Sequence, residues 1–146
     1  MNNTRLINKR KFVSSIRDLS FFGSAKIARF LSKILISSPK GITTIETIYN
    51  FKMKIDPIED NGIERAIYYF GTYEKGTLDV IGKMLTLGDT FVDIGANIGL
   101  MSLYASYAVG DSGKVISFEP NPKTHEMLKD NINLNNRQNI KPESFA

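Results

Sequence analysis

Short apolar runs separated by glycine-rich turns are the clearest pattern in the sequence, and they concentrate between residues 90 and 121. Phe91–Ile94 and Val115–Phe118 are bounded by turn residues and rich in β-branched or aromatic side chains, which predicts two buried strands. Leu100–Val109, between them, is apolar and long enough for a helix. Two strands joined by such a helix form a βαβ unit, so this stretch predicts neighbouring parallel strands with a right-handed crossover.

Weaker patterns on both sides of this unit predict further elements. Upstream they are a β-hairpin over residues 43–55 with Tyr49-Asn50 as its turn, a short helix over 64–70 and a helix over 73–85. Downstream, residues 121–133 predict an amphipathic helix with Asn121 as its N-cap and Pro122 at the first helical position. Its inward face is expected to carry Met127, Leu128, Ile132 and Leu134. Residues 139–142 then predict the approach to a third strand.

The first 40 residues form a basic helical prefix. Apolar residues recur at helical spacing from Phe12 to Ile36 with a break near Ser20–Ser24, which predicts two amphipathic helices after a frayed polar stretch over residues 1–10. The prefix carries nine Lys/Arg against one acid, whereas residues 41–146 carry ten against fourteen. One interpretation is weak contact with an anionic membrane surface through residues 12–36; the other is packing on the main domain with solvated charges. We expect no nucleic-acid partner, because no aromatic-interleaved basic stripe accompanies the charge.

Composition narrows the range of functions. The apolar fraction of 42% and the charged fraction of 23% are ordinary for a globular protein. The chain has no cysteine, which excludes disulfides and thiolate chemistry, and its one histidine leaves no room for a multi-histidine metal site. We therefore expect no metal. No run approaches the roughly 20 apolar residues of a membrane span, and no signal-type segment opens the chain, so the expected compartment is the cytoplasm.

Candidate chemistry lies where the two central strands end, because ligands of parallel sheets bind at the carboxyl ends of the strands. The turn Gly95-Ala-Asn-Ile-Gly99 lets a ligand approach the backbone closely, and Asn97 tolerates left-handed backbone angles. Glu119, at the end of the second strand, is placed to accept hydrogen bonds from two vicinal ribose hydroxyls. Asp93 can hold the amides of the turn or attract a cationic ligand, and its charge disfavours a diphosphate. These residues favour a cationic nucleoside over a dinucleotide.

Asp93–Gly99, followed some twenty positions later by Phe118–Pro122, resembles the FkbM-type S-adenosylmethionine-dependent methyltransferases. The resemblance extends through Tyr73-Glu74, Gly88-Asp89 and Leu128–Asn135, covers roughly residues 43–141, and leaves out the basic prefix. It implies an α/β fold: a partial, Rossmann-like doubly wound parallel sheet of the class I methyltransferase type, preceded by the helical prefix and the β-hairpin. The implied domains are the prefix at 1–40 and the N-terminal part of a methyltransferase domain at 41–146.

The resemblance also implies a cofactor, a reaction and a set of site residues. The cofactor is S-adenosylmethionine, and the reaction is O-methyl transfer to a hydroxyl of a glycan or small metabolite. Asp93, Gly95, Ala96, Asn97 and Gly99 form the cofactor loop, and Glu119 takes the ribose. Pro120 and Asn121 shape the adenosine edge, while Tyr73 and Glu74 match a pair that reaches the methionine end. No residue is a convincing catalytic base, and His125 is expected to be an exposed helix residue.

The family's sheet has seven strands, of which this chain supplies two and part of a third, so we expect a truncated chain that binds its cofactor weakly. Two other interpretations of the chain stay open. A non-catalytic relic or interaction module that keeps the fold is the first alternative. The second is an NAD-binding Rossmann domain, which is disfavoured because Asn97 stands at the second glycine of G-x-G-x-x-G.

Overall fold

The computed structural model describes residues 3–19, 21–60 and 62–145. The chain divides into two compact units. The first comprises the chain up to Phe51 together with Ile55–Tyr73, and the second comprises Lys52–Lys54 together with the chain from Glu74 onwards. The sequence-predicted boundary near residue 40 falls inside the first unit.

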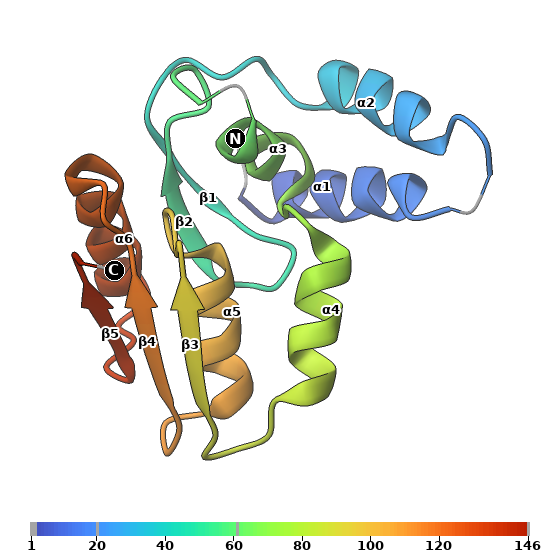
Figure 1. Ribbon diagram of the computed structural model, residues 1–146. Helices are drawn as coiled ribbons and strands as arrows, with labels where there is room; N and C mark the ends of the chain where they lie inside the picture. Colours follow the sequence, from blue (N-terminus) through green and yellow to red (C-terminus); the bar gives the residue numbers. More distant parts are fainter. Residues whose placement is uncertain (1–2, 20, 61, 146) are drawn as a thin grey trace. The chain divides into compact units, whose positions relative to one another are not determined.

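The first unit contains helices α1 (Asn3–Arg17), α2 (Ser24–Leu35) and α3 (Ile63–Phe70). Helices α1 and α2 run alongside each other (Figure 1) and are joined where Lys9 Nζ donates to the carbonyl of Leu35 over 2.9 Å. The predicted pair of helices with a break before Ser24 is confirmed. The predicted fraying of residues 1–10 is wrong for the described positions, because α1 already begins at Asn3. Packing explains this difference, since Ile7 and Arg10 lie buried on the inner face of α1.

Helix α2 turns its small residues inward and its large apolar residues outward. Ser24, Ala28 and Ser32 are buried, and small side chains of this kind let two helices approach closely. Ile27, Phe30 and Ile34 form an exposed apolar arc, with exposed fractions of 44%, 64% and 63%. The apolar periodicity that predicts this helix therefore does not mark its buried face. None of the helices described here is long and apolar enough to cross a membrane.

The predicted β-hairpin is present. Strands β1 (Thr43–Glu46) and β2 (Lys52–Ile55) form a two-stranded sheet. In the connecting turn Asn50 has a φ of 67°, and the amide of Thr47 donates to the carbonyl of Phe51 over 2.8 Å. Phe51, Met53 and Ile55 are buried, as the alternation of apolar and charged residues predicts.

The second unit is built on a three-stranded parallel sheet. Its elements from Glu74 onwards are α4 (Lys75–Met84), β3 (Thr90–Ile94), α5 (Leu100–Val109), β4 (Lys114–Phe118), α6 (Pro122–Leu134) and β5 (Ile140–Glu143). The strands lie side by side in the order β3-β4-β5, with Phe91 opposite Val115 and Val115 opposite Ile140 (Figure 1). The predicted α/β fold, a partial Rossmann-like parallel sheet, is confirmed.

One face of this sheet is covered by α5, which packs on β3 and β4. Leu103, Val109 and Val115 are fully or almost fully buried between them, and burying a side chain of this size contributes about 1.5–3 kcal/mol. Asp93 and Ser117 are also buried, while Val92 and Ile94, at alternate positions of the edge strand β3, are exposed. The predicted inward position of Leu134 is wrong, because this last residue of α6 is 36% exposed.

Candidate functional site

The loop between β3 and α5 has an unusual backbone, with positive φ at three of five residues. Gly95 has a φ of 79°, Asn97 of 50° and Gly99 of 91°, which confirms the left-handed conformation predicted for Asn97. A Cβ atom at Gly99 would lie 2.6 Å from Cδ1 of Leu128, whereas one at Gly95 would have no atom within 4 Å. Packing therefore requires glycine at position 99. At position 95 the backbone is open to an approaching molecule.

Hydrogen bonds tie this loop to the end of β4. The amides of Gly95 and Ala96 both donate to the carbonyl of Phe118 over 2.9 Å. The amide of Asn97 donates to Oε2 of Glu119 over 2.9 Å, and Oδ1 of Asn97 accepts the amide of Ile98 over 2.6 Å. The loop after β3 and Glu119 at the end of β4 are thus in direct contact, as expected from their predicted places at one end of the sheet.

Glu119 anchors two backbone segments at once. Its Oε1 atom accepts the amide of Asn121 over 3.0 Å while Oε2 holds Asn97, and the side chain is 8% exposed. An ionised carboxylate offers about four acceptor positions, so two remain for a diol. The predicted ribose contact stays a prediction, and the structure adds a role that the sequence did not reveal.

Asp93 contacts the first turns of α5 rather than the amides of the glycine turn. Its Oδ2 atom accepts the hydroxyl of Ser102 over 2.5 Å, and Ser102 in turn accepts the hydroxyl of Ser117 over 2.8 Å. Burial raises the pKa of the Asp93 carboxyl, the hydrogen bond from Ser102 opposes this, and the charge of Glu119 adds to it. Asp93 and Glu119 together make this end of the sheet electronegative.

The remaining predicted site residues are the N-caps of α4 and α6 and the residue before each of them. Asn121 is the N-cap of α6, where its side chain accepts the amides of Lys123 and Thr124, and Pro120 beside it is exposed. Glu74 is the exposed N-cap of α4 with a φ of 46° and opens the second unit, whereas Tyr73 is the last residue of the first. The roles assigned to these residues in cofactor binding stay predictions.

Four residues at or behind the site were missed or misjudged in the sequence. His125 is 9% exposed, so its predicted exposure is wrong; it shares the inward face of α6 with Leu128, one turn further on. The sequence pattern did not mark Ser102 and Ser117, because their hydrogen-bonded chain to Asp93 is visible only in the folded structure. Asn131 was missed as well, because its partner Lys54 lies 77 positions earlier in the chain.

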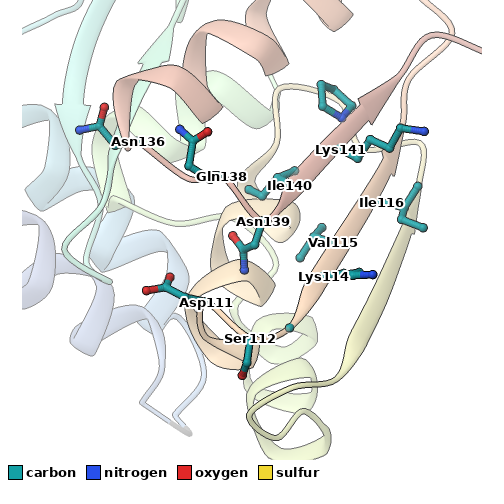
Figure 2. Close-up of a pocket in the computed structure, with 12 residues that line it drawn as sticks. Asp111, Ser112, Lys114, Val115, Ile116, Asn136, Gln138, Asn139, Ile140 and Lys141 are labelled. Atoms are coloured by element: carbon teal, nitrogen blue, oxygen red, sulfur yellow. The ribbon is translucent and has the colours of Figure 1, made fainter.

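A pocket of about 880 Å³ lies at the other end of the sheet (Figure 2). It is lined by residues 111–116 and by residues 136 and 138–142, at the amino ends of β4 and β5. Glu119 and the loop Gly95–Gly99 lie at the carboxyl ends of the strands. The pocket is therefore separate from the candidate site.

The model of the TRM5/TYW2 methyltransferase domain matches residues 44–143. The chain belongs to this family. The prediction of an S-adenosylmethionine-dependent methyltransferase domain is thereby confirmed at the level of the family. The chain has no significant match among the curated proteins compared.

Solved structures agree with the TRM5/TYW2 fold. P. horikoshii TYW2 in complex with MeSAdo is 21% identical, with a TM-score of 0.55, over 75% of this chain and 38% of that one. The complex of aTrm5 and tRNALeu is 22% identical with a TM-score of 0.54, over 75% of this chain and 29% of that one. The M. jannaschii tRNA m1G37 methyltransferase is 22% identical with a TM-score of 0.52, over 75% and 31%. The chain spans about a third of the length of these relatives.

These comparisons correct two predictions. The resemblance to the FkbM family is wrong, because the matching family is TRM5/TYW2. The residues that suggested it shape a backbone loop and its acidic anchor, and these do not encode the acceptor. The expectation of a glycan or small-metabolite acceptor without a nucleic-acid partner is also wrong, since one relative is solved with tRNALeu and another is named for a tRNA modification.

Proposed function

We propose that this chain is the cofactor-binding part of a TRM5/TYW2-type methyltransferase that uses S-adenosylmethionine to modify tRNA. Membership of the family over residues 44–143 is the observation that carries the proposal. The relatives described with MeSAdo and with tRNALeu support its cofactor and its substrate.

The geometry of the loop fits such a cofactor. The open face of Gly95 admits a ligand to the backbone, and Glu119 keeps acceptor positions for ribose hydroxyls. The carboxylates of Asp93 and Glu119 favour a ligand with a positive charge and disfavour a diphosphate. This charge pattern, together with Asn97 in place of a second glycine, argues against NAD.

We assign the roles of the side chains as follows. The loop Gly95–Gly99 holds the cofactor by its backbone, Glu119 orients the ribose, and Asp93 fixes the start of α5 behind the loop. Pro120 and Asn121 border the adenosine, while Tyr73 and Glu74 are assigned to the methionine end. S-adenosylmethionine bound here would supply an activated methyl group for in-line transfer to the acceptor, with the thioether as leaving group, so orientation of the two reactants would contribute much of the rate. In this assignment the residues of this chain bind and orient the cofactor.

Calorimetric titration of the full chain with S-adenosylhomocysteine tests cofactor binding. We expect a saturable 1:1 complex, weakened at least tenfold by Glu119→Ala, and no competition from NAD. Asp79→Asn, an exposed change on α4, is the matched control and should bind like the unmodified chain. Absence of binding at millimolar ligand would favour the non-catalytic relic and overturn the proposal.

A second experiment tests the substrate. The full chain is incubated with tritiated S-adenosylmethionine and either a tRNA transcript or a mixture of oligosaccharides. We expect any label transferred, and any electrophoretic shift, to appear with tRNA only. Cofactor binding with neither a shift nor label on tRNA would overturn the tRNA assignment while leaving the cofactor assignment standing.

A further inference from the structure

The side chain of Asn131 makes three hydrogen bonds from a fully buried position on α6. Its Oδ1 atom accepts the amide of Lys54 over 2.6 Å, and its Nδ2 atom donates to the carbonyl of Lys54 over 3.1 Å. The second proton of Nδ2 goes to the carbonyl of Ile98 over 2.9 Å. Both donors of the amide are therefore used, one on strand β2 and the other on the loop that follows β3.

Asn135, the C-cap of α6 four residues later, repeats the first half of this arrangement. Its Oδ1 accepts the amide of Lys52 over 2.9 Å, and its Nδ2 donates to the carbonyl of Lys52 over 2.7 Å. The two amides pair with the backbone of β2 at alternate residues, as a neighbouring strand would. This pairing explains why Lys52–Lys54 belongs to the second unit although Phe51 and Ile55, on either side of it, belong to the first.

Of these two asparagines, only Asn131 also forms a hydrogen bond to the loop of the candidate site. Ile98 has its amide fixed by Oδ1 of Asn97 and its carbonyl fixed by Asn131, while the amide of Asn97 is fixed by Glu119. The centre of the loop is thus held from two sides, by the acid at the end of β4 and by the amide on α6. The loop has three residues at positive φ, a conformation that persists only where its surroundings enforce it.

We propose that Asn131 is a positioning residue for the cofactor loop, which it fixes to strand β2. It touches no cofactor atom in this assignment and acts through the carbonyl of Ile98. The proposal rests on the proposed function for its effect on cofactor affinity. Its effect on the loop itself does not depend on that function. Aspartate is excluded at this position, because a carboxylate would face two carbonyl oxygens.

The test compares Asn131→Ala with Asn135→Ala in the full chain. Both variants lose two hydrogen bonds to β2, but only the first loses the bond to the loop. Amide hydrogen exchange in the cofactor-free protein reports the loop directly. We expect exchange at residues 97–99 to rise at least tenfold in Asn131→Ala and less than threefold in Asn135→Ala. Titration with S-adenosylhomocysteine should show at least tenfold weaker binding for Asn131→Ala only.

The outcomes separate the two proposals. Equal effects of the two variants on loop exchange, or no change in Asn131→Ala, would overturn the role of Asn131. If the unmodified chain binds no S-adenosylhomocysteine, the proposed function fails, and the exchange comparison still decides the positioning role. If Asn131→Ala does not fold, Asn131→Ser takes its place, since serine keeps a hydroxyl near β2 but cannot span to both carbonyls. The same exchange pattern is then expected, and its absence again overturns the proposal.

Discussion

Glu119 Oε2 accepts the backbone amide of Asn97, 22 positions earlier in the chain, over 2.9 Å. The bond joins the glycine-rich loop after β3 to the end of β4. Asn97 is in the left-handed region, with a φ of 50°, and its backbone amide is held by this carboxylate. The acid that we propose binds the ribose therefore also shapes the proposed cofactor loop.

Glu119→Ala should damage the fold as well as binding. The change leaves the amides of Asn97 and Asn121 without their acceptor in two part-buried hydrogen bonds, and an unsatisfied donor that is buried costs about 1–3 kcal/mol. We expect the free energy of unfolding in urea to fall by about 2 kcal/mol. Glu119→Gln keeps one acceptor oxygen and should lose about half as much. Equal stability of Glu119→Ala and the unmodified chain would contradict the anchoring role.

Two glycines of the loop should respond differently to alanine. Gly99→Ala combines a left-handed φ of 91° with a Cβ atom 2.6 Å from Leu128, so a loss of about 2–4 kcal/mol in unfolding free energy is expected. Gly95→Ala has a φ of 79° but open space, so only the backbone cost of about 1–2 kcal/mol applies. Urea denaturation measures both. Similar losses in the two variants would show that the contact with Leu128 does not set the requirement at position 99.

The sequence was sufficient for the parts of this fold that local pattern encodes. The apolar runs of β3 and β4, the N-cap Asn121 and the left-handed Asn97 follow from residue type and spacing. Contacts between distant positions could not be predicted from residue type and spacing. Asn131 and Lys54 are 77 positions apart, and neither residue indicates the other as its partner.

Packing also reversed two local expectations. In α2 the apolar arc that gives the helix its periodicity is exposed, because Ala28 and two serines supply the closer fit. His125 is a polar residue that is buried, because it lies on the inward face of α6 with Leu128 and Asn131. The acceptor was mispredicted because the residues used for that prediction, the loop and Glu119, carry no information about which substrate is methylated.

Asp93 should make stability depend on pH in the acid range. Burial raises its pKa in the folded state above the unfolded value of about 3.9. The folded state then binds more protons than the unfolded state between these two values, so this residue's contribution to the unfolding free energy falls as pH rises. In Asp93→Asn that contribution is absent, and asparagine can still accept from Ser102.

Urea denaturation of both proteins between pH 3.5 and pH 7 checks this sign. We expect the unfolding free energy of Asp93→Asn, relative to the unmodified chain, to increase with pH above about pH 4 and then to level off. Asp79→Asn, at an exposed position of α4, should give a difference close to zero throughout. A difference that decreases with pH would mean that the hydrogen bond from Ser102 outweighs burial.

Arg10→Met should stabilise the first unit. The guanidinium is fully buried, its Nε donates to the carbonyl of Tyr68 over 2.7 Å, and Nη1 and Nη2 have no hydrogen-bond partner among the described residues. Burial lowers the pKa of Arg10 to about 10, so the folded state holds this cation less favourably than the unfolded state at neutral pH. Methionine fills a similar volume without the charge, and replacing a buried charge in this way is worth about 1 kcal/mol or more.

Thermal and urea denaturation at pH 7 measure this gain, with Lys11→Met as the control on the exposed side of α1. Lys11 makes one exposed hydrogen bond to Asn50 over 3.2 Å, so its replacement should change the unfolding free energy by less than about 0.5 kcal/mol. A loss of stability in Arg10→Met would show that the bond to Tyr68, near the end of α3, outweighs the cost of the buried charge. The carbonyl of Tyr68 would then be the group that requires arginine in the interior of this unit.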